Sequence, residues 1–312
     1  MKYLVTGGAG FIGSHIVESL IRNGSKVRVL DNLSTGNYEN LKNVSAEIEF
    51  VEGDIRDSSQ CVNAAKDCDG IFHEAALVSV VDSIERPREN HDINITGTMN
   101  VLEAARIQGC KRIVFASSAA IYGNNPALPK NETMLPEPLS PYGAAKIAGE
   151  HLLQAYAEQY GINCVALRYF NVYGPRQDPN SMYSGVISKF VDCAKNKTTP
   201  IIFGDGKQTR DFIYVDDIVQ ANLKAMTVST KMPFLRCNIG TEIATSLLDV
   251  VEALRHISAT LAQPLFEPER PGDIRHSTAD ITSARDQLGF QPQKTDLKTN
   301  LGCILDSDFA TS

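Results

Sequence analysis

The sequence predicts an α/β protein: a doubly wound parallel sheet with a smaller C-terminal α/β lobe. Short runs of β-branched residues alternate with longer helical patterns, as expected of right-handed βαβ units. A glycine-rich segment, residues 7–13, directly follows the first strand-like run. The alternation loosens after about Asn171, where we place the start of the second lobe.

The elements can be assigned in order along the chain. Five of the fourteen prolines lie between Pro126 and Pro141, which predicts a long loop, and a second loop is expected at 174–179. Loops of this length are usually functional. We expect one unit from residues 1–170 plus 212–239 and another from 171–211 plus 240–312. Strands are expected at 3–5, 27–30, 48–51, 70–72, 112–115 and 164–167, and helices at 11–22, 92–107 and 142–160.

Composition narrows the class of protein. Of 312 residues, 43% are hydrophobic, which is enough for a sizeable core, and the formal net charge of -7 argues against a nucleic-acid partner. No apolar run reaches the about 18 residues that a membrane span needs, and no signal-peptide core precedes the first strand. The seven cysteines are scattered, without C-x-x-C spacing. We expect a cytoplasmic protein with free thiols, no membrane contact and no metal site.

The glycine-rich segment is typical of a dinucleotide site. Gly8, Gly10 and Gly13 satisfy the pattern G-x-G-x-x-G. A side chain at these positions would block the tight turn or the approach of the backbone to a pyrophosphate. The helix that follows offers unpaired N–H groups to the phosphates. The residues assigned to this contact are Gly7, Gly10, Phe11, Ile12 and Gly13.

Asp31 ends the second predicted strand, 18 residues after Gly13 (31 − 13). An acidic residue about 20 residues after the glycines hydrogen-bonds the adenosine ribose and would repel a 2′-phosphate. No Arg follows within residues 32–36. The sequence therefore predicts NAD rather than NADP, with further contacts from Asn32, Ser34, Thr35 and Gly36.

Two more strand ends suit the same cofactor. Asp54 and Ile55 follow the third strand, where they can hold the adenine. Small residues after the fourth strand let the backbone approach the dinucleotide, whereas His73 at its end is expected to be structural. The residues assigned there are Ala75, Ala76 and Leu77.

Tyr142 and Lys146 form a Y-x-x-x-K pattern that places both side chains on one helical face. A free tyrosine has a pKa of about 10, and a nearby ammonium and a positive nicotinamide favour the phenolate. We predict that Tyr142 is a catalytic base beside Lys146, with Ser118 positioning the reacting hydroxyl. Ser117 is expected to be structural or to face the nicotinamide. Asn94 either fixes backbone near Lys146 or satisfies a buried carbonyl.

The chain resembles the extended short-chain dehydrogenases/reductases, and among these the UDP-hexose 4-epimerases. The resemblance covers nearly the whole chain and implies a Rossmann sheet, a bound NAD contacted also by Tyr169, and a UDP-sugar substrate. The segment 171–189 is similar to bacterial UDP-N-acetylglucosamine 4-epimerases. The matching segments are 7–13, 31–36, 117–123, 140–146, 168–171, 210–217 and 270–273.

Ala119 and Ala120 indicate which reaction of this family to expect. Related dehydratases carry Asp-Glu at this place and decarboxylases carry Glu, whereas two methyl groups transfer no protons. The resemblance therefore implies reversible oxidation at C4 of a UDP-hexose through a 4-keto sugar.

The resemblance also implies the substrate contacts. A small residue at 277 leaves room for an N-acetyl group at C2, so we expect both UDP-glucose and UDP-N-acetylglucosamine to be accepted. Arg side chains suit a diphosphate because they bind it bidentately. The implied residues are Asn171, Arg210, Arg270 and Asp273 near the diphosphate, Val186, Ile187 and Phe203 near the uracil, and Ser277 near C2.

Other interpretations stay open at this point. A UDP-glucuronate epimerase would need a cation for the sugar carboxylate, and a reductase of small carbonyls would consume NADH. A redox-sensing binding module would not need Tyr142, Lys146 and Ser118 together. The family resemblance suggests a homodimer packed through helices 92–107 and 142–160.

Overall fold

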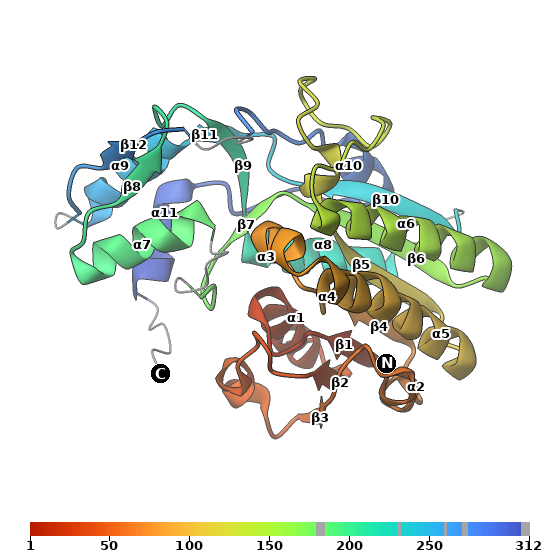
Figure 1. Cartoon of the computed structure of the whole chain (residues 1–312). Helices are drawn as coiled ribbons and strands as arrows, with labels where there is room; N and C mark the ends of the chain where they lie inside the picture. Colours follow the sequence, from red (N-terminus) through yellow and green to blue (C-terminus); the bar gives the residue numbers. More distant parts are fainter. Residues whose placement is uncertain (179–184, 230–231, 259–260, 270–273, 307–312) are drawn as a thin grey trace.

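The computed structural model describes residues 1–178, 185–229, 232–258, 261–269 and 274–306. A large sheet lies between helices, and a smaller group of short strands and helices lies beside it (Figure 1). The predicted α/β fold with a doubly wound parallel sheet and a smaller C-terminal lobe is confirmed.

The large sheet has seven parallel strands in the described part of the chain, in the order β10-β6-β5-β4-β1-β2-β3. The strand order reverses between β1 and β4, and doubly wound sheets bind ligands at the carboxyl ends of the strands at such a point. The strands are β1 (Lys2–Thr6), β2 (Lys26–Asp31), β3 (Ile48–Glu52), β4 (Gly70–His73), β5 (Arg112–Ser118), β6 (Asn163–Tyr169) and β10 (Phe234–Ile239).

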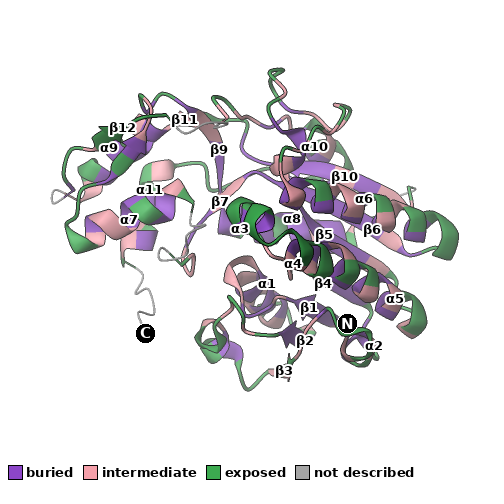
Figure 2. Ribbon diagram, in the orientation of Figure 1, coloured by how far each residue is buried: buried purple, intermediate pink, exposed green. Residues whose placement is uncertain are grey.

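Helices cover both faces of this sheet because successive strand residues point in opposite directions. Leu4 belongs to the hydrophobic core that contains residues of α2, α5 and α6, whereas Val5 belongs to the core that contains residues of α1, α8 and α10. Both side chains are buried, and Figure 2 shows the central strands buried between the helices. The helices are α1 (Phe11–Arg22), α2 (Ser58–Ala65), α5 (Thr98–Gln108), α6 (Pro141–Tyr160), α8 (Val215–Thr227) and α10 (Thr282–Leu288).

Local sequence sets the ends of α6. Ser140 Oγ accepts a hydrogen bond from Gly143 N at 3.2 Å, and Pro141 occupies the first turn, where its missing N–H costs nothing. Gly161 ends the helix at φ +68°, in the left-handed region that favours glycine. The helix therefore begins directly before Tyr142 and ends at Tyr160.

The predicted helix over 92–107 begins differently from the expectation. Residues Asp92–Gly97 form a π-helical turn, and α5 continues from it. Such wide turns are frequent at functional sites. Two short helices, α3 (Val80–Glu85) and α4 (Pro87–His91), precede it, and 3₁₀ turns span Tyr38–Val44 and Ala119–Tyr122.

The smaller part has its own hydrophobic core, formed by α7 (Val186–Asn196), α9 (Leu247–Ile257) and α11 (Leu297–Asp306) with the adjoining strands. A three-stranded sheet joins β11 (Ala244–Ser246), β9 (Thr209–Tyr214) and β7 (Asn171–Tyr173), and β12 (Leu265–Glu267) pairs with β8 (Ile201–Phe203). The boundary expected between residues 211 and 212 falls inside β9. The whole strand belongs to the smaller part, because it pairs with β7 and β11 rather than with the large sheet.

The two parts are tied together by backbone hydrogen bonds. Lys130 N donates to Thr278 O at 2.8 Å, and Asp280 N donates to Lys130 O at 2.8 Å. On the other side, Ser277 N donates to Thr209 O at 3.1 Å. The segment around Ser277 is therefore held both by the loop before α6 and by β9.

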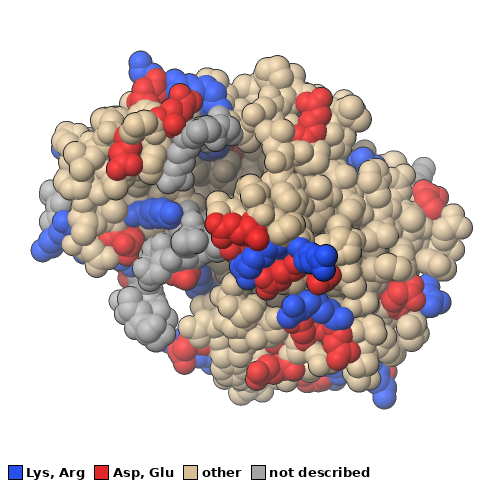
Figure 3. Space-filling model, in the orientation of Figure 1, with Lys and Arg blue, Asp and Glu red and all other residues tan. Residues whose placement is uncertain are grey.

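None of the helices in the described ranges combines the length and the apolar character of a membrane span. On the face shown in Figure 3, Lys and Arg side chains are interspersed with Asp and Glu.

A buried ion pair joins α6 to the sheet. Arg168 Nε and Nη2 donate to the two carboxylate oxygens of Glu150 at 2.9 and 2.7 Å, and the two side chains are 0% and 2% exposed. Ser117 Oγ also donates to Glu150, at 2.6 Å, and Arg168 Nη1 donates to Tyr122 Oη at 2.8 Å. Buried charges are tolerated only when they are paired in this way.

Arg168→Met should lower the free energy of unfolding by about 3–5 kcal/mol, because it leaves the Glu150 carboxylate buried without a partner. Arg285→Met is the matched control, since the Arg285–Glu242 pair is 46% and 40% exposed and should be worth about 1 kcal/mol or less. Urea unfolding followed by circular dichroism measures both. Equal stability of the two variants would contradict the structural role of the buried pair.

Candidate active site

The glycine turn lies where β1, β2 and β4 end. Gly7 has φ +69°, and a Cβ there would lie 2.7 Å from Ala75 N. A Cβ at Gly13 would lie 2.1 Å from Gly7 O, and one at Gly10 would lie 3.2 Å from the same oxygen. The turn is therefore bare backbone leading into α1, which fits the cradle of a dinucleotide pyrophosphate. Phe11 and Ile12 open α1 and pack against the core of the smaller part.

Asp31 lies beside this turn at the end of β2. Its carboxylate accepts hydrogen bonds from Ala9 N at 2.9 Å and Leu33 N at 2.8 Å. Burial raises its pKa, and these two bonds oppose the rise. Gly36 lies close, since a Cβ there would be 3.0 Å from Asp31 Oδ1, whereas Ser34 and Thr35 are exposed.

Asp54, after β3, is held by its neighbours. Asn32 Nδ2 donates to Asp54 Oδ2 at 2.8 Å, and Arg56 forms an ion pair with the same oxygen at 2.7 Å. The Arg56 hydrogen bond is the main cause that lowers the pKa of Asp54 to about 2. Ile55 is buried against Gly97, where a Cβ would lie 2.6 Å from Ile55 Cδ1.

Asn94 fixes the loop after β4. Its side chain accepts from Leu77 N and donates to Leu77 O, both at 2.9 Å, and it also donates to Asn90 Oδ1 at 2.8 Å. Of the two alternatives from the sequence, the satisfied carbonyl is observed, as Leu77 O, and the backbone that Asn94 fixes is that of Leu77. Asn94 satisfies the two backbone groups of Leu77, two residues after Ala75, whose backbone lies against Gly7.

His73 is structural, as expected. It is buried and hydrogen-bonds Thr6 Oγ1 at 2.8 Å and Thr98 Oγ1 at 3.0 Å. Burial, together with the charge of Lys146, lowers the pKa of His73 to about 3, so the ring is neutral.

Tyr142 and Lys146 lie one turn apart on the face of α6 that packs on the sheet, and they are 9% and 3% exposed. Lys146 Nζ donates to Ala116 O at 2.7 Å and lies 5.6 Å from the centre of the Tyr142 ring. Ser118 ends β5 beside them and caps the next turn, accepting from Ala120 N at 3.1 Å. Ser117 Oγ donates to Glu150 instead. Of the two roles expected for Ser117, the structural one therefore fits this contact.

Burial has the largest effect on the pKa of Tyr142. Burial raises its pKa to about 12, the hydrogen bond with Ser118 opposes this, and the charge of Glu74 adds to it. Within the chain, burial therefore outweighs the hydrogen bond with Ser118. Burial also lowers the pKa of Lys146 to about 8, while Glu74 opposes that change.

Glu74 is a site residue that the sequence analysis missed. It follows β4 directly, and Tyr169 Oη donates to its Oε1 at 3.0 Å. Burial raises the pKa of Glu74 to about 7, and the Tyr169 bond and the Lys146 charge oppose this. Its position at the carboxyl end of a central strand, between His73 and Ala75, was the available signal.

The smaller part places several predicted substrate residues along β7 and β9. Asn171 Nδ2 donates to Asp211 O at 3.1 Å, and Arg210 Nη1 donates to Thr209 O at 3.0 Å. Ser277 is held beside the same strand through its bond to Thr209.

The residues predicted to border the uracil differ in how far they are buried. Phe203 is half-buried at the end of β8, and Val186 is half-buried at the start of α7. Ile187 is 2% exposed and belongs to the core of the smaller part, where α7 packs. Arg270 and Asp273 lie outside the described residues.

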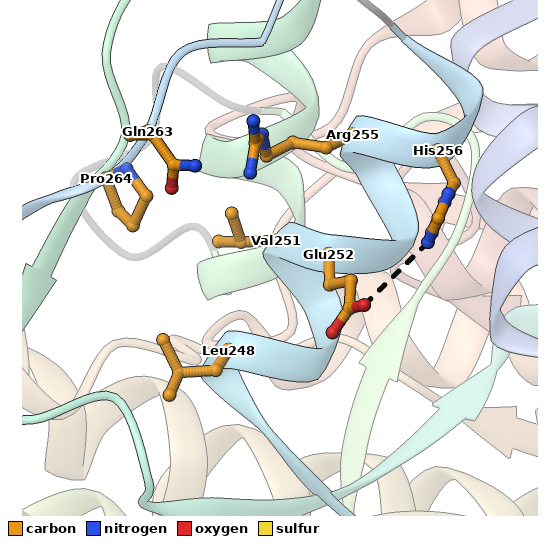
Figure 4. A pocket seen from close by; sticks show the side chains of 7 residues that line it. All are labelled: Leu248, Val251, Glu252, Arg255, His256, Gln263 and Pro264. Atoms are coloured by element: carbon orange, nitrogen blue, oxygen red, sulfur yellow. Dashed lines mark ion pairs between the residues drawn. The ribbon is translucent and has the colours of Figure 1, made fainter.

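A surface hollow beside α9 contains none of the predicted site residues (Figure 4). Its polar groups include Glu252 and His256, which form an ion pair at 3.8 Å, and Arg255. The hollow lies on the smaller part rather than at the strand ends of the large sheet, so it is not the site described above.

Comparisons with known proteins identify the family of the chain. Residues 3–240 match the NAD dependent epimerase/dehydratase family. The chain is 44% identical, over 96% of its length and 95% of the relative's, to a putative UDP-glucose 4-epimerase of Methanocaldococcus jannaschii. A UDP-glucose 4-epimerase of Thermotoga maritima with UDP-glucose is similar in structure (TM-score 0.92, 40% identity, 98% and 97% covered). A UDP-N-acetylglucosamine 4-epimerase of Methanobrevibacter ruminantium with UDP-N-acetylmuramic acid is also similar in structure (TM-score 0.92, 38% identity, covering 97% of this chain and 96% of the other).

Gly7→Ala should weaken NAD binding about tenfold or more, because the new Cβ meets the backbone of Ala75 and displaces the turn. Gly161→Ala is the matched control: Gly161 has φ +68° but nothing within 4 Å of a Cβ. Both variants carry the cost of about 1–2 kcal/mol for a side chain in the left-handed region. Calorimetric titration of nucleotide-free protein with NAD measures the difference, and equal affinities would refute the cradle.

Proposed function

The chain belongs to the NAD-dependent epimerase/dehydratase family, and on this basis we propose that it interconverts the C4 epimers of a UDP-hexose. The observation that carries the proposal is the buried pair of Tyr142 and Lys146 beside Ser118 at the carboxyl edge of the sheet. Ala119 and Ala120 stand where an acid pair would serve dehydration. One acid–base group and a redox cofactor suffice for reversible oxidation at a single carbon.

NAD, when bound, supplies the acceptor and donor of a hydride at C4. The residues at the glycine turn and Asp31 fit this cofactor, because the turn leaves backbone bare and Asp31 offers a carboxylate to a ribose. Tyr142 Oη takes the proton of the C4 hydroxyl and later returns it, while Ser118 holds the hydroxyl. Lys146 favours the phenolate in that step. Between the removal and the return of the hydride, the 4-keto sugar rotates so that its opposite face is presented. The configuration at C4 is therefore inverted.

The smaller lobe, residues 171–211 plus 240–312, binds the UDP-sugar, and residues 1–170 plus 212–239 bind NAD. The core around α7, α9 and α11 and the place of β10 in the large sheet support this division, whereas α10 packs on the large sheet and β9 pairs throughout with β7 and β11. Asn171 and Arg210 hold the diphosphate, and Ser277 leaves room at C2. The relatives whose names include UDP-glucose and UDP-N-acetylglucosamine support both substrates.

The enzyme works as a cytoplasmic homodimer packed through α5 and α6. Exposed apolar side chains on these helices support the contact, among them Met99 (47% exposed), Ile107 (54%) and Tyr160 (54%). All seven cysteines are free thiols, which supports a reducing compartment.

Purified enzyme incubated with UDP-glucose should yield UDP-galactose, and UDP-N-acetylglucosamine should yield its C4 epimer, both detected by NMR without net consumption of cofactor. UDP-glucuronate is tested as a third compound. Its turnover in place of the neutral hexoses would favour the alternative function, a UDP-glucuronate epimerase. Net oxidation of NADH would favour a reductase.

The same assay tests the role of Tyr142. Tyr142→Phe should lower kcat by about 10²–10⁴-fold, the usual contribution of a general acid–base. Tyr156→Phe is the control on the same helix, because Tyr156 Oη bonds Glu103 outside the site. Near-normal turnover by Tyr142→Phe would remove the assignment.

Ser277→Tyr should leave UDP-glucose active but lower kcat/KM for UDP-N-acetylglucosamine by about 10-fold or more, because a bulky ring occupies the space of the N-acetyl group. Thr278→Tyr, at the neighbouring position, is the control. Competition assays with both substrates in one reaction give the ratio directly. An unchanged ratio in Ser277→Tyr would exclude residue 277 as the determinant at C2.

A further inference from the structure

Asp211, on β9, carries a buried carboxylate that accepts four hydrogen bonds from two other segments of the chain. The residue is 0% exposed. Thr241 N and Oγ1 both donate to Asp211 Oδ1 at 2.7 Å, and Glu242 N donates to Asp211 Oδ2 at 3.0 Å. Ala279 N donates to the same Oδ2 at 3.0 Å. One side chain therefore joins β9, the residues that follow β10, and the segment that contains Ser277.

Asp211 lies where the segment that contains Ser277 leaves β9. Up to Ser277 the two chains pair as in a parallel ladder: Thr209 N donates to Arg275 O at 3.0 Å, and Ser277 N donates to Thr209 O at 3.1 Å. If this ladder continued, the backbone oxygen of Asp211 would accept from Ala279 N. Instead, Ala279 N donates to the side-chain carboxylate. The carboxylate therefore takes the place of a backbone acceptor.

The backbone oxygen of Asp211 has a different partner, because Asn171 Nδ2 donates to it at 3.1 Å. Past the point of divergence, the chain pairs with the loop before α6: Lys130 N donates to Thr278 O and Asp280 N donates to Lys130 O, both at 2.8 Å. The Asp211 carboxylate thus stands between β9 and the diverging segment, and it separates the two by the length of a side chain.

We propose that Asp211 is a positioning residue that determines specificity, because its carboxylate fixes the distance between β9 and the segment that contains Ser277. The proposal rests on the function proposed above, in which Ser277 borders C2 of the sugar and Arg210 and Asn171 hold the diphosphate. Arg210 precedes Asp211 in the chain, Asn171 bonds its backbone, and Ser277 lies two residues before Ala279. The carboxylate therefore sets the room at C2 relative to the place where the diphosphate is held.

The packing beside this carboxylate is tight. A Cβ at Gly240, directly after β10, would lie 2.7 Å from Ala279 Cβ and 2.8 Å from Asp211 Oδ2. Gly240→Ala must therefore displace one of these two groups, although it removes none of the hydrogen-bonding partners. Asp211→Ala acts in the opposite way, since it removes the carboxylate and adds no atom. Two changes of different kind thus disturb the same contact.

Both variants should change the preference at C2. Calorimetric titration of NAD-loaded protein with UDP-glucose and with UDP-N-acetylglucosamine gives the two dissociation constants, and a Tyr142→Phe background slows turnover. The bulkier N-acetyl group depends on the wall at residue 277 more than a hydroxyl does. The ratio of the Kd for UDP-N-acetylglucosamine to the Kd for UDP-glucose should therefore rise about threefold to tenfold, the range expected for one lost hydrogen bond.

Thr241→Val is the matched control, because it removes the bond from Thr241 Oγ1 to Asp211 and keeps the bond from Ala279 N. Its ratio should not change. The affinity for NAD, titrated into nucleotide-free protein, should stay the same in all three variants, since Gly7 and Asp31 lie at the ends of β1 and β2. A general loss of structure would weaken NAD binding as well, so this titration separates positioning from folding.

Hydrogen exchange tests the contact itself without any ligand. The peptide that covers residues 274–281 should exchange faster in Asp211→Ala than in Thr241→Val, because the Ala279 amide loses its acceptor only in the first variant. If Asp211→Ala does not fold, Gly240→Ala provides the same comparison of affinities.

An unchanged ratio of affinities in a folded Asp211→Ala or Gly240→Ala variant would overturn the proposal. So would an equal loss of affinity for NAD and for both UDP-sugars, because that result would come from unfolding. Wild-type protein that binds both UDP-sugars but epimerises neither would refute the proposed reaction alone, since the ratio of affinities is measured without turnover.

Discussion

The buried ion pair of Glu150 with Arg168 determines where α6 lies on the sheet. Tyr142, Lys146 and Glu150 follow one another at intervals of four residues, so they share the face of α6 that packs on β5 and β6. Glu150 is fixed by Arg168 and Lys146 by Ala116 O. Because neither charge can leave its partner cheaply, the helix cannot slide or turn, and the position of the Tyr142 phenol follows from this constraint.

Much of the fold could be predicted because it depends on local patterns. The glycine turn and the apolar periodicity gave α1 its observed bounds, Phe11–Arg22, and parallel strands buried on both faces read as short apolar runs. The strands with which a given strand pairs cannot be predicted from local patterns. β9 has the composition of any half-buried strand, and only the tertiary fold assigns it to β7 and β11. The π-helical turn before α5 has no distinct sequence signal either.

The candidate site was predictable as a set of residues but less so as an electrostatic environment. Spacing alone placed Tyr142 and Lys146 together, whereas their pKa values depend on how deeply the fold buries them and on Glu74. Sequence indicates a carboxylate at the end of β4, but not that Tyr169 and Asn222 hold it in place. Long-range contacts of this kind join residues that lie 53 to 95 positions apart.

The bridge between Lys130 and Ala279 has a consequence for how a reaction could proceed between the two lobes. With Lys130 bonded to Thr278 and Asp280, and Ser277 bonded to β9, the segment that contains Ser277 is held from both lobes. A hinge motion at this seam would have to break these backbone bonds. In the proposed reaction, the half-turn that presents the opposite face of the ketone is therefore a motion of the ligand rather than of the lobes.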